Sequence, residues 1–274
     1  MICLDKVTKN VPWFSAILVG LLLAGCGGGG GQSPILGLNS TVAVATPVIL
    51  PPPTVTAVVP VNNATGVPLN TVNIVAALSE PIVPVTGAAS FTLTCASPCV
   101  SPNGTVALNS NATTATLVLA NGTLLAPSTV YTATVNGVKS VATGLTLVSP
   151  YVWTFTTGLT SSLSRPSVTS TIPVTQVGGS TTPANSALFA IFSRDMAPGS
   201  ISTSSFTLSC SAPCVAPSGI VTYVVDSRTA VFVPGATLTV GSVYTATITT
   251  AATDLANNAL GGNQAPLPAA SNYV

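Results

Sequence analysis

The chain has 274 residues, which is enough for two domains of ordinary size that each bury a core. Charged residues make up 4% of the sequence, against roughly 25% in a typical soluble domain, and the formal net charge is +1. A protein with so few charges has no positive electrostatic field that would attract a polyanion. The composition therefore argues against nucleic-acid binding.

The first residues have the pattern of an export signal. Lys6 and Lys9 precede an apolar run over residues 11–25, which is shorter than the roughly 20 residues of a membrane-spanning helix and fits a signal-peptide core. The run ends in Leu-Ala-Gly-Cys, which resembles the lipobox of bacterial lipoproteins. The resemblance implies a signal peptide over residues 1–25 and lipidation of Cys26. The alternative is an ordinary signal peptide in which Cys26 is incidental.

By the same resemblance, the residue after Cys26 indicates the destination. Gly27 stands where Asp would signal retention at the inner membrane, so the outer membrane or cell surface is expected. Residues 26–52 then form a predicted linker, which begins with five glycines and ends in a stiffer Pro-rich stretch. Within it, residues 41–50 (TVAVATPVIL) are apolar enough to act as a strand.

The rest of the chain repeats one unit. PTVT at residues 53–56 recurs as PSVT at 166–169, FTLTCASPCV at 91–100 as FTLSCSAPCV at 206–215, and YTAT at 131–134 as YTAT at 244–247. The offsets are 113, 115 and 113 residues, which small loop insertions explain. The sequence therefore predicts two copies of one domain, over residues 53–158 and 165–274, joined by a short link at 159–164.

Each copy is predicted to be all-β. Short β-rich runs in the first copy are separated by Asn, Gly, Pro and Ser, at residues 54–59, 72–78, 90–95, 104–107, 113–120, 129–136 and 152–157. About seven short strands in roughly 100 residues are typical of an immunoglobulin-like (Ig-like) sandwich. Val72, Ile74, Ala76 and Leu78 alternate with other residues, as expected of a strand with one buried face.

Several of these segments resemble the bacterial Ig-like domains of S-layer and other surface proteins. They are the opening at residues 53–70, SEP at 79–81, YTATV at 131–135, WTFTTG at 153–158 and, in the second copy, DLANNAL at 254–260. The resemblance covers nearly everything after Pro53. It implies the fold, and it implies a spacer or adhesive role only weakly, because one fold serves many functions.

Four cysteines form two C-x3-C pairs, Cys95 with Cys99 and Cys210 with Cys214, each around a Pro-containing turn. In an oxidising compartment such pairs are expected to be disulfides. Zinc would need four Cys or His ligands, and the chain has no His. A redox role is the other alternative, although the oxidoreductase motif has two intervening residues rather than three.

The remaining polar residues predict no enzyme, cofactor or metal site. The chain has five acidic residues and no His, so it lacks a carboxylate cluster and the commonest general base. Glu80 and Asp195 are expected at similar places in the two copies as turn or N–H acceptors. A contact of Asp254 with Ca²⁺ is the weaker alternative to a role in its own loop.

Two further features admit both a functional and a structural interpretation. Lys139 and Glu80 could belong to an intramolecular isopeptide bond of the kind found in some surface Ig-like domains, but the second copy contains no Lys. Tyr131 and Tyr244 could be ligand aromatics, but core or corner tyrosines of a sandwich are the better interpretation.

The second copy lacks a counterpart for the last strand of the first. The first copy closes with YVWTFTTG at residues 151–158, whereas the second reaches Tyr273-Val274. One hypothesis is a longer natural chain, in which these residues are the stalk of an ice-binding, adhesive or enzymatic protein. The other is donor-strand complementation, in which residues 41–50 of another copy fill the gap and build a head-to-tail filament. The predicted function is a non-enzymatic cell-surface lipoprotein with a structural or adhesive role and an unknown surface ligand.

Overall fold

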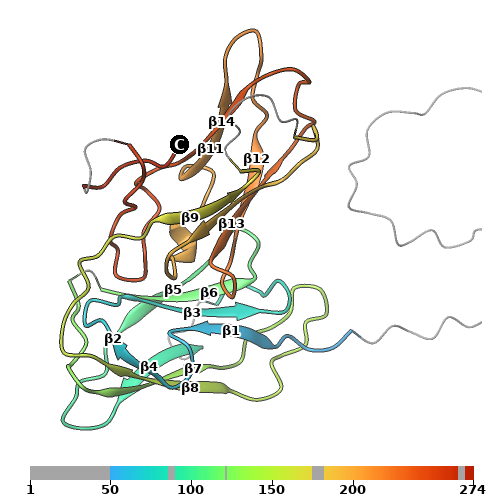
Figure 1. Cartoon of the computed structure of the whole chain (residues 1–274). Coiled ribbons are helices and arrows are strands. Elements are labelled where there is room, and N and C mark those ends of the chain that lie inside the picture. Colours follow the sequence, from blue (N-terminus) through green and yellow to red (C-terminus); the bar gives the residue numbers. More distant parts are fainter. Residues whose placement is uncertain (1–49, 86–89, 121, 175–181, 265–268) are drawn as a thin grey trace, which may run out of the picture. The chain divides into compact units, whose positions relative to one another are not determined.

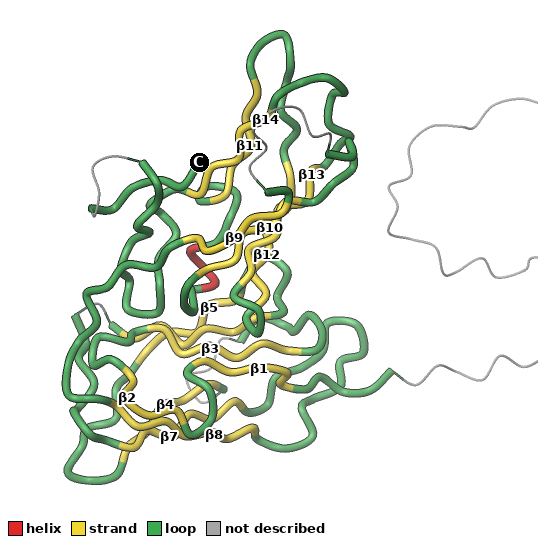
Figure 2. The backbone as a smooth tube through the Cα atoms, viewed as in Figure 1, coloured by secondary structure: helices red, strands yellow, loops and turns green. Residues whose placement is uncertain are grey.

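The computed structural model describes residues 50–274 except 86–89, 121, 175–181 and 265–268. Both copies of the repeat belong to one compact unit, Ile49–Val274. The predicted signal peptide, Cys26 and residues 41–49 lie outside the described residues. The described part is built from strands and loops, with one turn of 3-10 helix, η1 (Pro198–Ser200), as Figure 2 shows. None of these segments forms a helix able to cross a bilayer.

The first repeat is a sandwich of two four-stranded sheets (Figure 1). One sheet has the order β1-β3-β6-β5 and the other β2-β8-β7-β4, and every pair is antiparallel except β2 with β8. The strands are β1 (Val55–Val59), β2 (Ala64–Val67), β3 (Asn73–Leu78), β4 (Phe91–Cys95), β5 (Gly104–Leu108), β6 (Thr114–Leu119), β7 (Val130–Val135) and β8 (Tyr151–Thr157). The all-β, Ig-like prediction is confirmed, as are the seven strands expected in this repeat.

Strand β2 was not predicted. It is four residues long, it pairs in parallel with β8, and Gly66 within it has a φ of 69°, in the left-handed region that favours glycine. Two of its residues are exposed, so no alternation of apolar and polar residues indicates a strand.

Aromatic side chains fill the space between the two sheets of the first repeat. Trp153 and Phe155 of β8 and Tyr131 of β7 are each at most 2% exposed. The Trp153 ring lies 5.7 Å from the Phe91 ring, and the Tyr131 and Phe155 rings stack at 5.6 Å. Pairs of this kind add to the free energy gained by burying apolar area. Strand β8 thus brings two of the three largest buried side chains of this core, and β7 brings the third.

The second repeat follows the same plan with fewer strands. Its larger sheet has the order β12-β13-β10-β9, which matches β5-β6-β3-β1, and its smaller sheet is the pair β11-β14, which matches β4-β7. The strands are β9 (Val168–Ile172), β10 (Leu188–Phe192), β11 (Phe206–Cys210), β12 (Gly219–Val224), β13 (Thr229–Pro234) and β14 (Tyr244–Ile248). In the described part of the chain, the pairing of β7 with β8 has its counterpart in the bridge between Ile248 and Tyr273, which corresponds to the pair Val135 and Tyr151.

Strand β3 is buried on both of its faces, whereas the sequence predicted one buried face. Ile74, Ala76 and Leu78 face the core of the first repeat as expected. Asn73 and Val75, on the opposite face, are also at most 5% exposed. The expectation of a single buried face was therefore wrong, because residues of the second repeat cover the other one, and Val75 belongs to the hydrophobic cluster of that repeat.

Candidate functional site

The short link between the repeats is held by a reciprocal pair of hydrogen bonds. The side-chain amide of Asn70 donates to the Ser162 carbonyl oxygen at 2.8 Å, and the Ser162 N–H donates to Asn70 Oδ1 at 2.8 Å. The Leu69 N–H also donates to the Thr160 carbonyl oxygen, at 3.1 Å. These bonds tie the link to the end of the first repeat, so it cannot act as a free swivel.

A loop of the second repeat docks on the start of β3. The Leu255 carbonyl oxygen accepts the backbone N–H groups of Val72 at 3.0 Å and Asn73 at 3.2 Å. The Asn73 side-chain amide donates to the same oxygen at 3.2 Å and to Asn257 Oδ1 at 3.1 Å. Asn73 is buried, and its side-chain nitrogen donates both of these bonds across the contact between repeats.

Asp254 shapes that docking loop. Its Oδ1 accepts the N–H groups of Ala256 and Asn258, each at 2.9 Å, and its Oδ2 accepts the Asn258 side-chain amide at 3.1 Å. Asp254 as a whole is 3% exposed, and its Oδ2 lies 3.5 Å from Arg194 Nη1. The structure therefore gives Asp254 the role of a hydrogen-bond acceptor within its own loop. No cluster of three potential metal ligands occurs among the described residues.

Arg194 joins this loop to the link. Its Nη1 donates to the Ser164 carbonyl oxygen at 3.0 Å and to Ser162 Oγ at 3.3 Å. We refer to the contacts made by Asn70, Asn73, Ser162, Arg194 and the loop 254–258 as the seam. Beside the seam, Val59 and Val75 of the first repeat pack into the hydrophobic cluster of the second, so polar and apolar contacts hold the repeats together.

The predicted correspondence between Glu80 and Asp195 is off by one residue. Ser79 Oγ accepts the Thr54 N–H, and Ser193 Oγ accepts the Ser167 N–H in the same way, which makes Arg194 the counterpart of Glu80. Glu80 accepts the Ser140 hydroxyl at 2.6 Å, at the place where Arg194 faces Asp254. The side chain of Lys139 is exposed, and Glu80 is engaged by Ser140.

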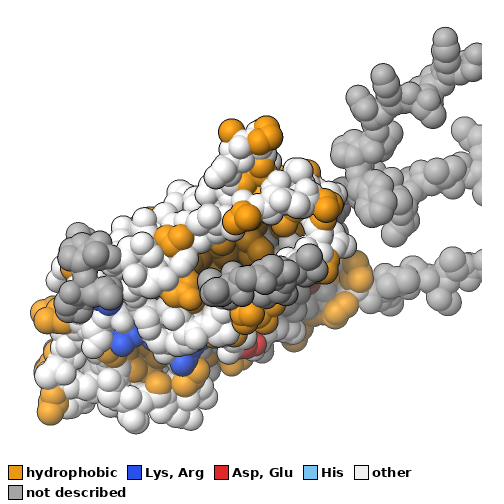
Figure 3. Space-filling view, turned by 45° about the horizontal axis from the view of Figure 1, so that its top comes forward, with side chains coloured by type: hydrophobic (Ala, Val, Ile, Leu, Met, Phe, Trp, Pro, Cys, Tyr) orange, Lys and Arg blue, Asp and Glu red, His pale blue; other side chains and the backbone are white. Residues whose placement is uncertain are grey.

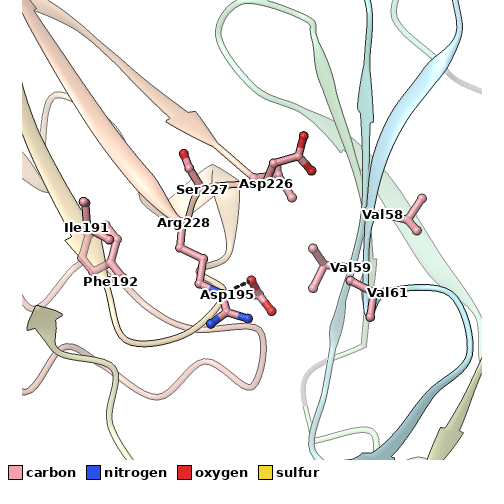
Figure 4. Close-up of a pocket in the computed structure, with 10 residues that line it drawn as sticks. Val58, Val59, Val61, Ile191, Phe192, Asp195, Asp226, Ser227 and Arg228 are labelled. Carbon is pink, nitrogen blue, oxygen red and sulfur yellow. Dashed lines mark hydrogen bonds and ion pairs between the residues drawn. The ribbon is translucent and has the colours of Figure 1, made fainter.

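A cavity of about 400 Å³ lies between the repeats (Figure 4), and no residue of the loop 254–258 is among those that line it. Val59 and Val61 line it from the first repeat, and Phe192, Asp195 and Arg228 line it from the second. Arg228 Nε donates to Asp195 Oδ1 at 2.8 Å, so these two charges neutralise each other. The cavity thus presents apolar surface, a closed ion pair and the side chains of Asp226 and Ser227.

The tyrosines are structural in both repeats. The Tyr131 hydroxyl accepts the Ala126 N–H at 2.9 Å, and the Tyr244 hydroxyl accepts the Thr239 N–H at 2.8 Å, each five residues upstream. This is the tyrosine-corner arrangement that the sequence suggested. Burial raises the pKa of a third tyrosine, Tyr223, above its ordinary value, and its hydroxyl accepts the Met196 N–H at 3.0 Å.

Both C-x3-C pairs are bonded. Cys95 and Cys99 have Cα atoms 5.8 Å apart, and Cys210 and Cys214 have Cα atoms 5.9 Å apart. Each bond closes the loop that follows β4 or β11. The Tyr131 hydroxyl lies 3.4 Å from Cys99 Sγ, so the first disulfide adjoins the tyrosine corner.

One side of the second sandwich is less covered than its counterpart in the first. In the sheet that β8 extends, Leu93, Tyr131 and Ala133 face the core and are at most 3% exposed. Their counterparts Leu208, Tyr244 and Ala246 are half-buried. We call the side of β11 and β14 that carries these last three residues the open face. Figure 3 shows hydrophobic side chains gathered in a hollow of the second repeat. Sequence reasoning did not indicate that these three side chains are less covered than their counterparts.

A family model described as bacterial Ig-like domain matches residues 51–157 and again residues 163–269. The chain belongs to this family. Its members are structural domains that are generally without catalytic activity. No protein of curated function matches the chain.

Solved structures with similar folds include parts of much longer proteins. The native alpha-2-macroglobulin of Escherichia coli is 15% identical, with 59% of this chain and 9% of that chain covered at a TM-score of 0.30. The S-layer protein SbsC is 15% identical, with coverages of 78% and 34% and a TM-score of 0.31. The N-terminal part of SbsC is 16% identical, with coverages of 71% and 43% and a TM-score of 0.31. In each case the chain spans less than half of the matched protein.

Proposed function

We propose that the protein is a non-enzymatic cell-surface lipoprotein whose two Ig-like domains form a structural or adhesive stalk. The seam is the observation that carries this proposal, because its contacts restrict the motion of one domain relative to the other and make the pair stiff. A stiff pair on a Gly-rich tether holds a binding partner at a distance from the membrane. The family, and the resemblance of residues 23–26 to a lipobox, support the same assignment.

The anchor is tested in bacteria that process lipoproteins, by labelling with an alkyne analogue of palmitate. The wild-type chain is expected to take the label, and Cys26→Ala is expected to lose it, whereas the matched variant Cys3→Ala should keep it. Protease added to intact cells should digest the labelled chain if it faces outward. Label on Cys26→Ala, or full protection from protease, would contradict the proposal.

A second candidate function is a filament subunit linked by donated strands, and the open face is the observation that favours it. An uncovered sheet edge with apolar side chains is a ready template for a strand from another chain. In this candidate, residues 41–50 of one copy fill the open face of the next, and the head-to-tail contact repeats without closing.

Replacing residues 41–50 by a Gly/Ser segment of equal length separates the two candidates. A filament subunit should lose assembly, measured by sedimentation and electron microscopy, while its circular dichroism stays unchanged. A stalk should tolerate the replacement. The equal length keeps the reach of the tether constant, so only the strand-forming residues differ.

A further inference from the structure

The cavity between the repeats is lined by a large share of the chain's few charges. Three of its ten lining residues, Asp195, Asp226 and Arg228, are charged, against 4% of the whole sequence. Arg228 Nε donates to Asp195 Oδ1 at 2.8 Å, so these two side chains are paired. No residue in the described part of the chain forms an ion pair with the Asp226 carboxylate. The cavity therefore carries one unbalanced negative charge.

The turn that supplies Asp226 and Arg228 does not need charged residues to form. It connects β12 and β13, and its counterpart between β5 and β6 has Asn-Ser-Asn-Ala at residues 109–112. Both turns hold one residue in the left-handed region, Ala112 with a φ of 55° and Arg228 with a φ of 53°. The turn of the first repeat thus forms the same backbone without charge. The two charges belong to the turn that lines the cavity, which points to a role there.

The opposite wall of the cavity is apolar. Val59 and Val61 line it from the first repeat, and in the view of Figure 4 the Asp195 carboxylate lies on the side of Arg228 that faces these valines. Val61 is 61% exposed, so a ligand in the cavity would cover apolar surface that water now contacts. The seam holds the two repeats together, and both walls are therefore in place before a ligand binds.

The two walls together select the chemistry of a ligand. A volume of about 400 Å³ suits a small molecule. An anion would meet two carboxylates and an arginine that is already paired, and a neutral apolar molecule would cover Asp226 without pairing it, which is costly. A divalent metal ion needs about six oxygen ligands, and valine side chains offer none. A positively charged nitrogen on a short apolar chain satisfies both walls.

We propose that the cavity binds a small alkylammonium ion, with the ammonium group facing the carboxylates of Asp195 and Asp226 and the apolar chain lying on Val59 and Val61. Among the described residues, Arg228 occupies Oδ1 of Asp195, and Oδ2 accepts no hydrogen bond. An ammonium group has three N–H donors and can use this oxygen. The site goes beyond the proposed stalk, which needs no ligand here, so either assignment can fail without the other.

The test titrates the full-length chain, in a non-ionic detergent, with butylammonium chloride and follows the backbone amide signals by nuclear magnetic resonance. We expect saturable shifts at Val61 and residues 226–228, in roughly the millimolar range for so small a probe. The matched control is 1-butanol, which has the same number of non-hydrogen atoms without the charge and should bind about tenfold more weakly. Absence of saturable shifts at these residues, or equal binding of the two probes, would overturn the proposal.

A substitution of Asp226 tests the role of charge at an exposed position. Asp226→Asn is expected to weaken butylammonium binding about fivefold and to leave the binding of 1-butanol unchanged. Lys139→Gln is the control, because it removes an exposed charge outside the cavity and should leave both affinities as they are. Butylammonium binding by Asp226→Asn that equals wild type would show that the carboxylate has no part in the site.

A bulky side chain tests the apolar wall. Val61→Trp should fill the cavity and block butylammonium, whereas Val152→Trp, at a valine of the same repeat that is 53% exposed and outside the cavity, should not. The amide spectrum of each variant shows whether it is folded. Undiminished binding by folded Val61→Trp would place the probe elsewhere and contradict the proposal.

Two further probes identify which part of the ligand is read and where it comes from. Ammonium chloride should bind far more weakly than butylammonium, and equal affinities would overturn the proposal because the apolar wall would then contribute nothing. Nα-acetyl-lysine amide carries the same group as a peptide does. If it binds as butylammonium does, the site accepts a lysine side chain. If it fails to bind while butylammonium binds, the site takes free amines, and the proposal holds in either case.

Discussion

Asp254 shows how a single side chain joins local and long-range structure. Its carboxylate closes the loop 254–258 by accepting two backbone N–H groups, and it faces Arg194, which reaches the link at Ser162 and Ser164. The matching place in the first repeat has Ser140, whose hydroxyl accepts the N–H groups of Ala142 and Thr143. One loop design thus works with a hydroxyl or a carboxylate, but only the carboxylate also engages an arginine.

Replacing Asp254 by alanine is expected to lower the free energy of unfolding by about 2–4 kcal/mol. The substitution leaves two part-buried N–H groups, those of Ala256 and Asn258, without an acceptor and removes the partner of Arg194. Urea unfolding followed by circular dichroism measures the loss. Asp226→Ala is the matched control, because Asp226 is exposed and its removal should change stability by less than about 0.5 kcal/mol. Equal midpoints for the two variants would contradict the role given to Asp254.

Strand β8 is the element that most clearly distinguishes the first repeat from the second. It supplies Trp153 and Phe155 to the first core, and no counterpart of these side chains covers the open face among the described residues. Trp153 is 1% exposed, and its Nε1 has no hydrogen-bond partner among the residues that the structure describes. The indole therefore contributes through its apolar surface, while its N–H is a cost.

Substitutions at Trp153 should follow volume rather than hydrogen bonding. Trp153→Ala is expected to cost about 3–5 kcal/mol, because it leaves a large cavity next to Phe91. Trp153→Phe is expected to cost less than about 2 kcal/mol, since it keeps an aromatic ring and removes the unpaired N–H. Urea midpoints of the two variants give the comparison. A Phe variant as unstable as the Ala variant would show that the N–H has a partner.

The strands of the first repeat could be predicted because two local properties mark them in the sequence. Turn-forming residues separate the strands, and apolar residues alternate with others within them. Parallel strand β2 could not be predicted, because Gly66 and two exposed positions give it no periodic pattern. The second buried face of β3 was also missed, since it depends on a partner that lies about 180 residues away in sequence, as the separation of Asn73 and Leu255 shows. The candidate site was predicted less well than the fold, because Asn70 and Asn73 are indistinguishable in sequence from ordinary turn residues.

At the scale of the whole molecule, the seam couples the stability of the two repeats. The link is bonded to the first repeat, the loop 254–258 is bonded to β3, and Val59 and Val75 share a hydrophobic cluster with the second repeat. Opening one repeat would expose apolar surface and buried amides of the other. The pair should therefore unfold together rather than as two independent domains.

Calorimetry tests this coupling. The wild-type chain is expected to melt in one transition, and the double variant Asn70→Ala with Asn73→Ala is expected to melt in two, because it loses four hydrogen bonds made by the two side chains. Asn136→Ala is the control, as Asn136 is exposed and outside the seam. Two transitions in the wild-type chain would mean that the seam is too weak to couple the repeats.

The seam also limits how these domains could be rearranged. In the second repeat the position of Asn73 is held by Ala187, four residues before Ile191, as Asn73 lies four before Ala77, and both strands pair there with a threonine. A chain with the repeats in reverse order would therefore bring an alanine methyl group to the docking loop in place of an amide. The two repeats are therefore not interchangeable at the seam. In the reversed order the two domains would lose the Asn73 contacts and could move relative to each other.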